Sequence, residues 1–71
     1  MATDVKAPLT GTVWKIECKV GDQVAEGDVL VILESMKMEI PVEAPAGGTV
    51  AEIRVAEAQP INEGVVVVVL A

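Results

Sequence analysis

The stretch VKAPLTGTVWKI at residues 5–16 returns 37 residues later as VEAPAGGTVAEI at residues 42–53. The same offset places AEGDVLVIL at 25–33 over NEGVVVVVL at 62–70, and no gap is needed between the two matches. Twelve of the 29 aligned pairs are identical, far more than chance would give. Two copies are too few for a solenoid, which needs at least about three repeats. We therefore expect two related halves that pack face to face around a pseudo-two-fold axis.

Within each half the residue pattern is that of β-strands. The runs VLVIL at 29–33 and VVVVVL at 65–70 are β-branched and aliphatic throughout, which is typical of buried strands. Glycine and proline interrupt the chain at short intervals and mark turns, and no stretch has a helical period over a helical length. The sequence therefore predicts an all-β protein, either a small sandwich or a flattened barrel.

The link between the halves is an unusual turn. The repeat is centred between Lys37 and Met38, within ESMKME at residues 34–39. A two-residue hairpin turn of type I′ needs positive φ at both central positions, so asparagine and glycine are the usual residues there. This turn has neither, and bulky side chains at such positions cost energy. We expect a single domain over residues 1–71, with half-repeats 5–33 and 42–70 joined by a hairpin at 34–41.

The composition argues against several classes of function. A net charge of −6 and a single aromatic residue oppose nucleic-acid binding, which depends on Lys, Arg and base stacking. The chain has no histidine and one cysteine, so we expect neither an intrachain disulfide nor a metal site. The longest apolar run, residues 65–71, is far below the roughly 20 residues that cross a bilayer. With no signal-peptide pattern at residues 1–6, we expect no membrane association and a cytoplasmic location.

Two conspicuous residues outside the turn have structural interpretations. Cys18 aligns with Val55 in the second half, so we expect it to be a small core hydrophobe. Trp14 aligns with an alanine, and we expect it to be a partly buried structural residue rather than a ligand platform.

Two interpretations of the turn compete. Lysine at a hairpin tip is ordinarily just solvated, and methionine is a flexible filler of cores. Against this, Lys37 is bracketed by Met36 and Met38 at the centre of a duplicated β-protein, where local turn rules are broken. An amine on four methylenes at a projecting turn is accessible to another protein's active site, and the methionines with Glu34 and Glu39 would mark it. No base stands beside Lys37 in the sequence, so we expect no catalytic site in this chain.

These residues resemble the biotinyl domain of biotin carboxyl carrier proteins. The resemblance runs from APLTGTV through VGDQVAEGDVLVILESMKMEI to APAGGTV and the final valine run, and MKM in this frame is a highly specific mark of the family. The short length is most similar to small free-standing biotin/lipoyl attachment proteins of bacteria. An excised C-terminal segment of a larger carboxylase is the alternative.

The resemblance implies a flattened β-barrel of two four-stranded antiparallel sheets, with the modified lysine on a tight hairpin. It implies that biotin protein ligase joins biotin to Lys37 through an amide, using ATP, and that Met36 and Met38 flank the biotinyl-lysine. Glu34 and Glu39 carry over as ligase contacts. The carrier would be a non-catalytic subunit, monomeric in isolation, whose swinging arm takes carboxylate from biotin carboxylase to carboxyltransferase.

Two other functions remain open at this point. One is a lipoyl carrier of a dehydrogenase or glycine-cleavage complex, and the other is an unmodified interaction domain of the same fold. Lipoyl domains usually have acidic or small residues beside the lysine, so methionine on both sides favours biotin. One departure from the family pattern is Ala58-Gln59-Pro60, where the first half has Gly21-Asp22, and we expect this later turn to differ in shape.

Overall fold

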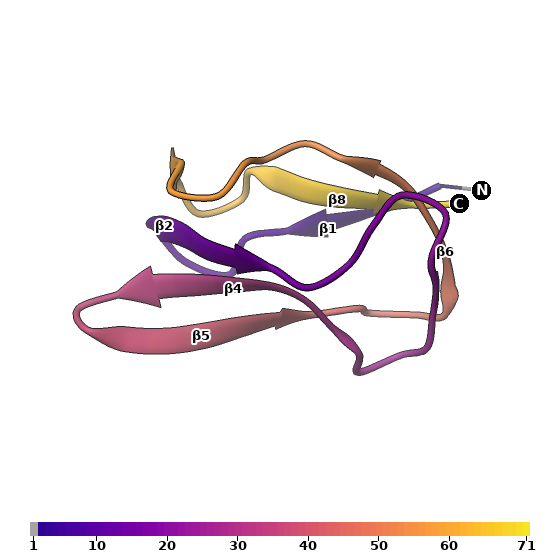
Figure 1. Cartoon of the computed structure of the whole chain (residues 1–71), viewed down its shortest axis with the longest axis horizontal. Coiled ribbons are helices and arrows are strands. Elements are labelled where there is room, and N and C mark those ends of the chain that lie inside the picture. The colour runs from indigo at the N-terminus through magenta and orange to yellow at the C-terminus, as the bar shows by residue number, and fades with distance from the viewer. Residues whose placement is uncertain (1) are drawn as a thin grey trace.

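The computed structural model describes residues 2–71, which form β-strands joined by short turns (Figure 1). No helix among these residues has the length and hydropathy that a membrane span requires. The strands are β1 Thr3–Lys6, β2 Gly11–Ile16, β3 Gln23–Val24, β4 Val29–Ser35, β5 Met38–Glu43, β6 Gly48–Ile53, β7 Pro60–Ile61 and β8 Val66–Leu70.

The strands make two four-stranded sheets. Their orders are β1-β8-β6-β3 and β5-β4-β2-β7, and every neighbouring pair is antiparallel. The molecule is elongated, with principal extents of 33 × 17 × 17 Å, and β4 and β5 run along its length (Figure 1). The predicted all-β class with two four-stranded antiparallel sheets is confirmed.

The two sheets are related by the offset seen in the sequence. Strands β2 and β3 begin and end 37 residues before β6 and β7. Replacing each strand by its counterpart converts the order β1-β8-β6-β3 into β5-β4-β2-β7. Hydrogen bonds repeat in the same way, since Gly27 N–H donates to the Ala44 carbonyl and Gly64 N–H to the Ala7 carbonyl, both at 2.9 Å. The predicted pseudo-two-fold symmetry is therefore confirmed.

The core is filled by matching aliphatic residues from both halves. Fully burying one such side chain stabilises a fold by about 1.5–3 kcal/mol, and a chain of this length depends on these few contacts. No polar or charged residue among those described is buried. The matched core residues are Val5 with Val42, Ala7 with Ala44, Val13 with Val50, Val31 with Val68, and Leu33 with Leu70.

Cys18 belongs to this core, as expected from its alignment with Val55, which is buried with it. Burial raises the pKa of the Cys18 thiol, and the nearby Asp22 carboxylate raises the pKa further. The thiol is therefore held in its neutral form, which is the less reactive form.

The turn after β6 keeps the shape of the turn after β2, so the expected difference is wrong. Gly21 has φ 97° and its counterpart Ala58 has φ 70°. A side-chain oxygen of Asp22 accepts a hydrogen bond from the backbone N–H three residues earlier at 2.9 Å, and the Gln59 amide oxygen does the same at 3.0 Å. Gln59 thus replaces the aspartate as a local acceptor, while Ala58 accepts a left-handed backbone at a cost of about 1–2 kcal/mol.

Trp14 lies outside the core, at a bulge in β2. Val13 pairs with Leu33 but Lys15 pairs with Ile32, so Trp14 is the additional residue on its strand. Val13 is fully buried, whereas Trp14 is 48% exposed, more than we expected for a structural residue.

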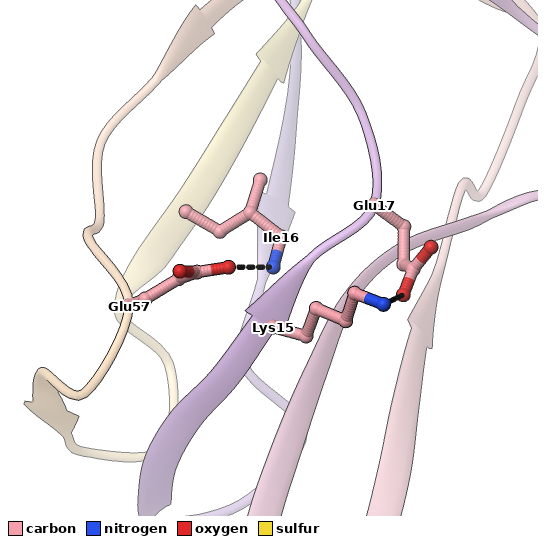
Figure 2. Close-up of polar contacts among 4 residues, drawn as sticks. All are labelled: Lys15, Ile16, Glu17 and Glu57. Carbon is pink, nitrogen blue, oxygen red and sulfur yellow. Dashed lines mark hydrogen bonds and ion pairs between the residues drawn. The ribbon is translucent and has the colours of Figure 1, made fainter.

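Beyond the bulge, the strand returns to alternation. In Figure 2 the side chains of Lys15 and Ile16 leave β2 in opposite directions. Lys15 extends toward Glu17, with Nζ 3.7 Å from Oε1, and Ile16 N–H donates to Glu57 Oε2 at 3.5 Å. The bulge therefore puts both Trp14 and Lys15 on the outer face of the sheet.

Candidate functional site

The hairpin between β4 and β5 turns through only two residues, Met36 and Lys37. Ser35 pairs with Met38, so the turn lies directly between these two strand ends. Met36 has φ 52° and Lys37 has φ 64°, which is the pair of positive values that a type I′ turn requires. The left-handed region costs a residue with a side chain about 1–2 kcal/mol, so the loop is held in a conformation that asparagine or glycine would adopt more easily.

The side chains at this turn point into solvent. Met36 is 92% exposed and Met38 is 63% exposed, and Lys37 between them is exposed as well. Scattered exposed apolar residues are common, but two methionines at one projecting tip contribute almost nothing to the core that could explain them. Met36, Lys37 and Met38 are therefore exposed together at the tip of the hairpin.

The pseudo-symmetry shows how far the hairpin projects. Leu33 pairs with Ile40, and the equivalent pair at the other end of the molecule is Leu70 with Thr3. Beyond Leu33 and Ile40 the hairpin adds two further residue pairs and the turn, and it forms one tip of the long axis in Figure 1. The strand pair β1–β8 stops at the opposite tip without a turn between the two strands.

Charge near the tip is negative. Glu34 and Glu39 are directly opposite each other and both are exposed. Like charges at facing positions destabilise a strand pair, so this arrangement does not serve the stability of the hairpin. The ion pairs among residues 2–71 join Lys15 to Glu17 and Arg54 to Glu52, and neither includes Lys37.

Gly11 supports the hairpin from the neighbouring strand, and the sequence reasoning did not assign it this role. A Cβ atom at Gly11 would lie 2.8 Å from the Glu34 carbonyl oxygen and 3.5 Å from Ser35 Cβ. A Cβ atom at Gly48, the counterpart of Gly11, would lie 2.8 Å from the Ala71 carbonyl oxygen. The signal in the sequence was that glycine occupies both equivalent positions, 11 and 48. At each position a backbone carbonyl approaches the space that a side chain would fill.

The geometry suits presentation of an amine rather than catalysis. The last two residue pairs of the hairpin and its turn contain three charged residues, Glu34, Glu39 and Lys37, and all three are exposed. Residues 2–71 contain no group of three or more side chains placed to hold a metal ion. An exposed primary amine with four methylenes can form an amide with a carboxylic acid inside another protein's active site.

Comparison with known proteins identifies the family to which this chain is similar. A family model described as "Biotin-requiring enzyme" matches residues 2–70. The chain is 57% identical over 42 residues to the "Biotinylated protein TB7.3 homolog" of Mycobacterium leprae, and this match spans 59% of this chain and 59% of that protein. It is 50% identical over 38 residues to the "Biotin/lipoyl attachment protein" of Bacillus subtilis, across 54% of this chain and 52% of the relative.

A solved structure gives the same fold. The urea carboxylase of Kluyveromyces lactis contains a region that superposes with a TM-score of 0.95 and 34% sequence identity. The match covers 100% of this chain and 6% of the carboxylase. The likeness therefore concerns one region of a much larger enzyme.

Proposed function

The chain belongs to the family of biotin-requiring attachment domains and is a biotin carrier domain, and we propose that Lys37 is the residue to which its biotin is attached. The observation that carries this proposal is the turn itself. Lys37 is exposed at the second central position of a two-residue turn, at φ 64°, on the tip of an elongated scaffold. The left-handed conformation of this turn costs energy in the isolated domain. Such strain is expected at a functional site, here one where an enzyme has to receive the Lys37 side chain.

Each residue of the tip has a part in the proposal. Lys37 Nζ forms an amide with the carboxyl group of biotin, and ATP drives the loss of water in the active site of a biotin protein ligase. Met36 and Met38 flank the amine and give the ligase an apolar shape to recognise. Glu34 and Glu39 supply the ligase with a pair of negative charges on one face of the hairpin.

The scaffold would act by presenting the arm and not by catalysis. Biotin, when attached, carries carboxylate between two enzyme active sites. We place this chain between a biotin carboxylase and a carboxyltransferase, as its likeness to a region of urea carboxylase supports. Attachment to a common carrier keeps the arm at high effective concentration near both sites, and the core and turns hold the hairpin rigidly for each docking event.

The boundaries and setting belong to the same proposal. We treat residues 1–71 as one attachment domain, monomeric in isolation, with half-repeats 5–33 and 42–70 around the hairpin. We also place the chain in the cytoplasm, where ATP is available for the ligation. Binding to nucleic acid or to membranes has no part in this function.

Intact-mass measurement tests the site. Wild-type protein treated with biotin, ATP and a biotin protein ligase should gain the mass of one biotin less one water. Lys37→Arg should gain nothing, because the guanidinium does not replace the amine as a nucleophile, whereas the matched control Lys19→Arg should be labelled as wild type. Biotin retained on Lys37→Arg would contradict the assignment. A wild-type chain that takes lipoate from a lipoate ligase with ATP, and takes no biotin from the biotin protein ligase, would favour the lipoyl alternative.

A further inference from the structure

The outer face of the β5-β4-β2-β7 sheet carries an exposed apolar surface that the attachment site does not use. Trp14 is 48% exposed at the β2 bulge, beside Lys15, which pairs with Ile32 on β4. Ile32 in turn pairs with Pro41 on β5. Neither Trp14 nor Ile32 belongs to the core cluster, so these side chains face away from it.

The pseudo-symmetry provides an internal control for this surface. The equivalent face of the β1-β8-β6-β3 sheet has Ala51 where the first sheet has Trp14. It also has Asp4 in place of Pro41, and Gln23 in place of Pro60. The counterpart of Ile32 is Val69, which is apolar but only 8% exposed. The exposed part of this second face is therefore small and polar around Ala51. The tryptophan face is a specific addition, and exposed apolar surface of this kind marks a protein contact.

This face is continuous with the hairpin. Leu33 is buried, so Glu34, the next residue along the strand, faces outward with its partner Glu39. Ile32 precedes the turn by four residues, a separation of roughly 13 Å along a strand. A protein contact of standard size buries about 800 Å² on each partner, which is wide enough to include Trp14, both glutamates and the turn together.

The face also continues away from the hairpin into an acidic groove. Ile32 lines an open groove of about 600 Å³, together with Val29 and Val24. The same groove is also lined by three acidic residues, Glu17, Asp22 and Asp28. A partner for this surface needs an apolar pocket for the indole, with Lys or Arg side chains around it.

We propose that this Trp14-centred face is the docking surface for the biotin protein ligase that modifies Lys37, an inference that rests on the proposed function. The unmodified amine ends only four methylenes from the backbone, so the ligase has to stand against the hairpin while it reacts. Enzymes that act later meet an arm lengthened by biotin and can stand further away. The ligase surface therefore presents an apolar pocket for Trp14, bordered by basic residues that pair with Glu34 and Glu39.

Ligation kinetics test this assignment. With a bacterial biotin protein ligase, biotin and ATP, Trp14→Ala should raise the KM for the carrier about tenfold while changing kcat little, because truncating a tryptophan anchor weakens docking rather than chemistry. Trp14→Phe should recover most of the affinity. Val65→Ala is the matched control, since Val65 is an exposed apolar residue at 38% in the turn before β8 of the other sheet and lies outside the groove, and the KM of this variant should match wild type.

A second measurement does not depend on a truncated variant. Trp14 is the only tryptophan, so carrier labelled with fluorotryptophan gives one fluorine resonance. Unlabelled ligase added to labelled Lys37→Arg carrier should shift or broaden this resonance in a saturable way. A KM for Trp14→Ala within twofold of wild type, or a resonance unchanged by saturating ligase, would overturn the docking surface alone. A wild-type chain that the ligase does not modify would overturn the proposed function as well.

Discussion

The two ends of the long axis are built on equivalent strand pairs, β4–β5 and β1–β8, and finish differently. At one end Leu33 pairs with Ile40 and at the other Leu70 pairs with Thr3, and both leucines are buried. Only the first end continues into two more residue pairs and a strained turn (Figure 1). Because the core closes at both ends without the additional residues, the hairpin extension serves to position a side chain and adds little to stability.

The largest expected difference between the ends comes from the two close-approach glycines. A Cβ at Gly11 or at Gly48 would lie 2.8 Å from a carbonyl oxygen, that of Glu34 or Ala71 respectively. Glu34 is held between two paired strands, whereas Ala71 is hydrogen-bonded on one side only, where its N–H donates to the Thr49 carbonyl at 2.7 Å and its carbonyl accepts from Thr49 N–H at 3.4 Å. We expect Gly11→Ala to lower the free energy of unfolding by about 2–3 kcal/mol and Gly48→Ala by about 1 kcal/mol.

Urea denaturation followed by circular dichroism measures both losses on the same scale. Equal losses at the two glycines would show that the hairpin end is no more rigid than the open end. That result would remove the main structural difference between them.

The second prediction concerns the strained turn. Replacing Met36 by Asn and Lys37 by Gly puts residues that favour positive φ at both central positions, and we expect the free energy of unfolding to rise by about 1–2 kcal/mol. The same variant should accept no biotin, so stability and modification would change in opposite directions. Met38→Leu is the control, because Met38 lies outside the turn and the volume is nearly unchanged, and its stability should equal that of wild type. Thermal denaturation measures the stability of each variant, and intact mass after ligase treatment measures the modification. An unchanged melting temperature for the Asn-Gly variant would show that the turn is not strained.

The smallest expected effects lie at the paired turns Gly21 and Ala58. Both residues have positive φ, so Ala58→Gly should stabilise the fold by about 0.5–1 kcal/mol and Gly21→Ala should destabilise it by about 1 kcal/mol. Chemical denaturation of the two single variants measures the pair. A loss of stability in Ala58→Gly would mean that the flexibility of glycine in the unfolded chain outweighs the relief of strain at this turn.

Much of the architecture could be predicted because the sequence repeats. The offset of 37 residues gives the correspondence of strands, and the centre of the repeat gives the position of the hairpin. The positive φ values at Met36 and Lys37 were likewise expected from a two-residue turn between strands. These features depend on local pattern and on symmetry, both of which are visible in one sequence.

The parts that could not be predicted depend on atoms outside the pattern. The β2 bulge places Trp14 and Lys15 on the same side, and strict alternation cannot reveal where an additional residue is inserted. The turn at Ala58 kept its shape because a glutamine oxygen reached the N–H that an aspartate reaches in the first half. Gly11 owes its importance to a carbonyl oxygen on another strand, and such a distance appears only in three dimensions.

The position of Thr3 beside Leu70 affects how the molecule can be tethered. Both residues lie at the tip opposite Lys37, so a polypeptide joined to either would leave from the pole that no modifying enzyme has to approach (Figure 1). A longer linker at this end would widen the range over which the Lys37 side chain can move, and it would leave the surroundings of the Lys37 amine unaltered. The same geometry therefore suits both a free-standing protein and one domain of a longer polypeptide.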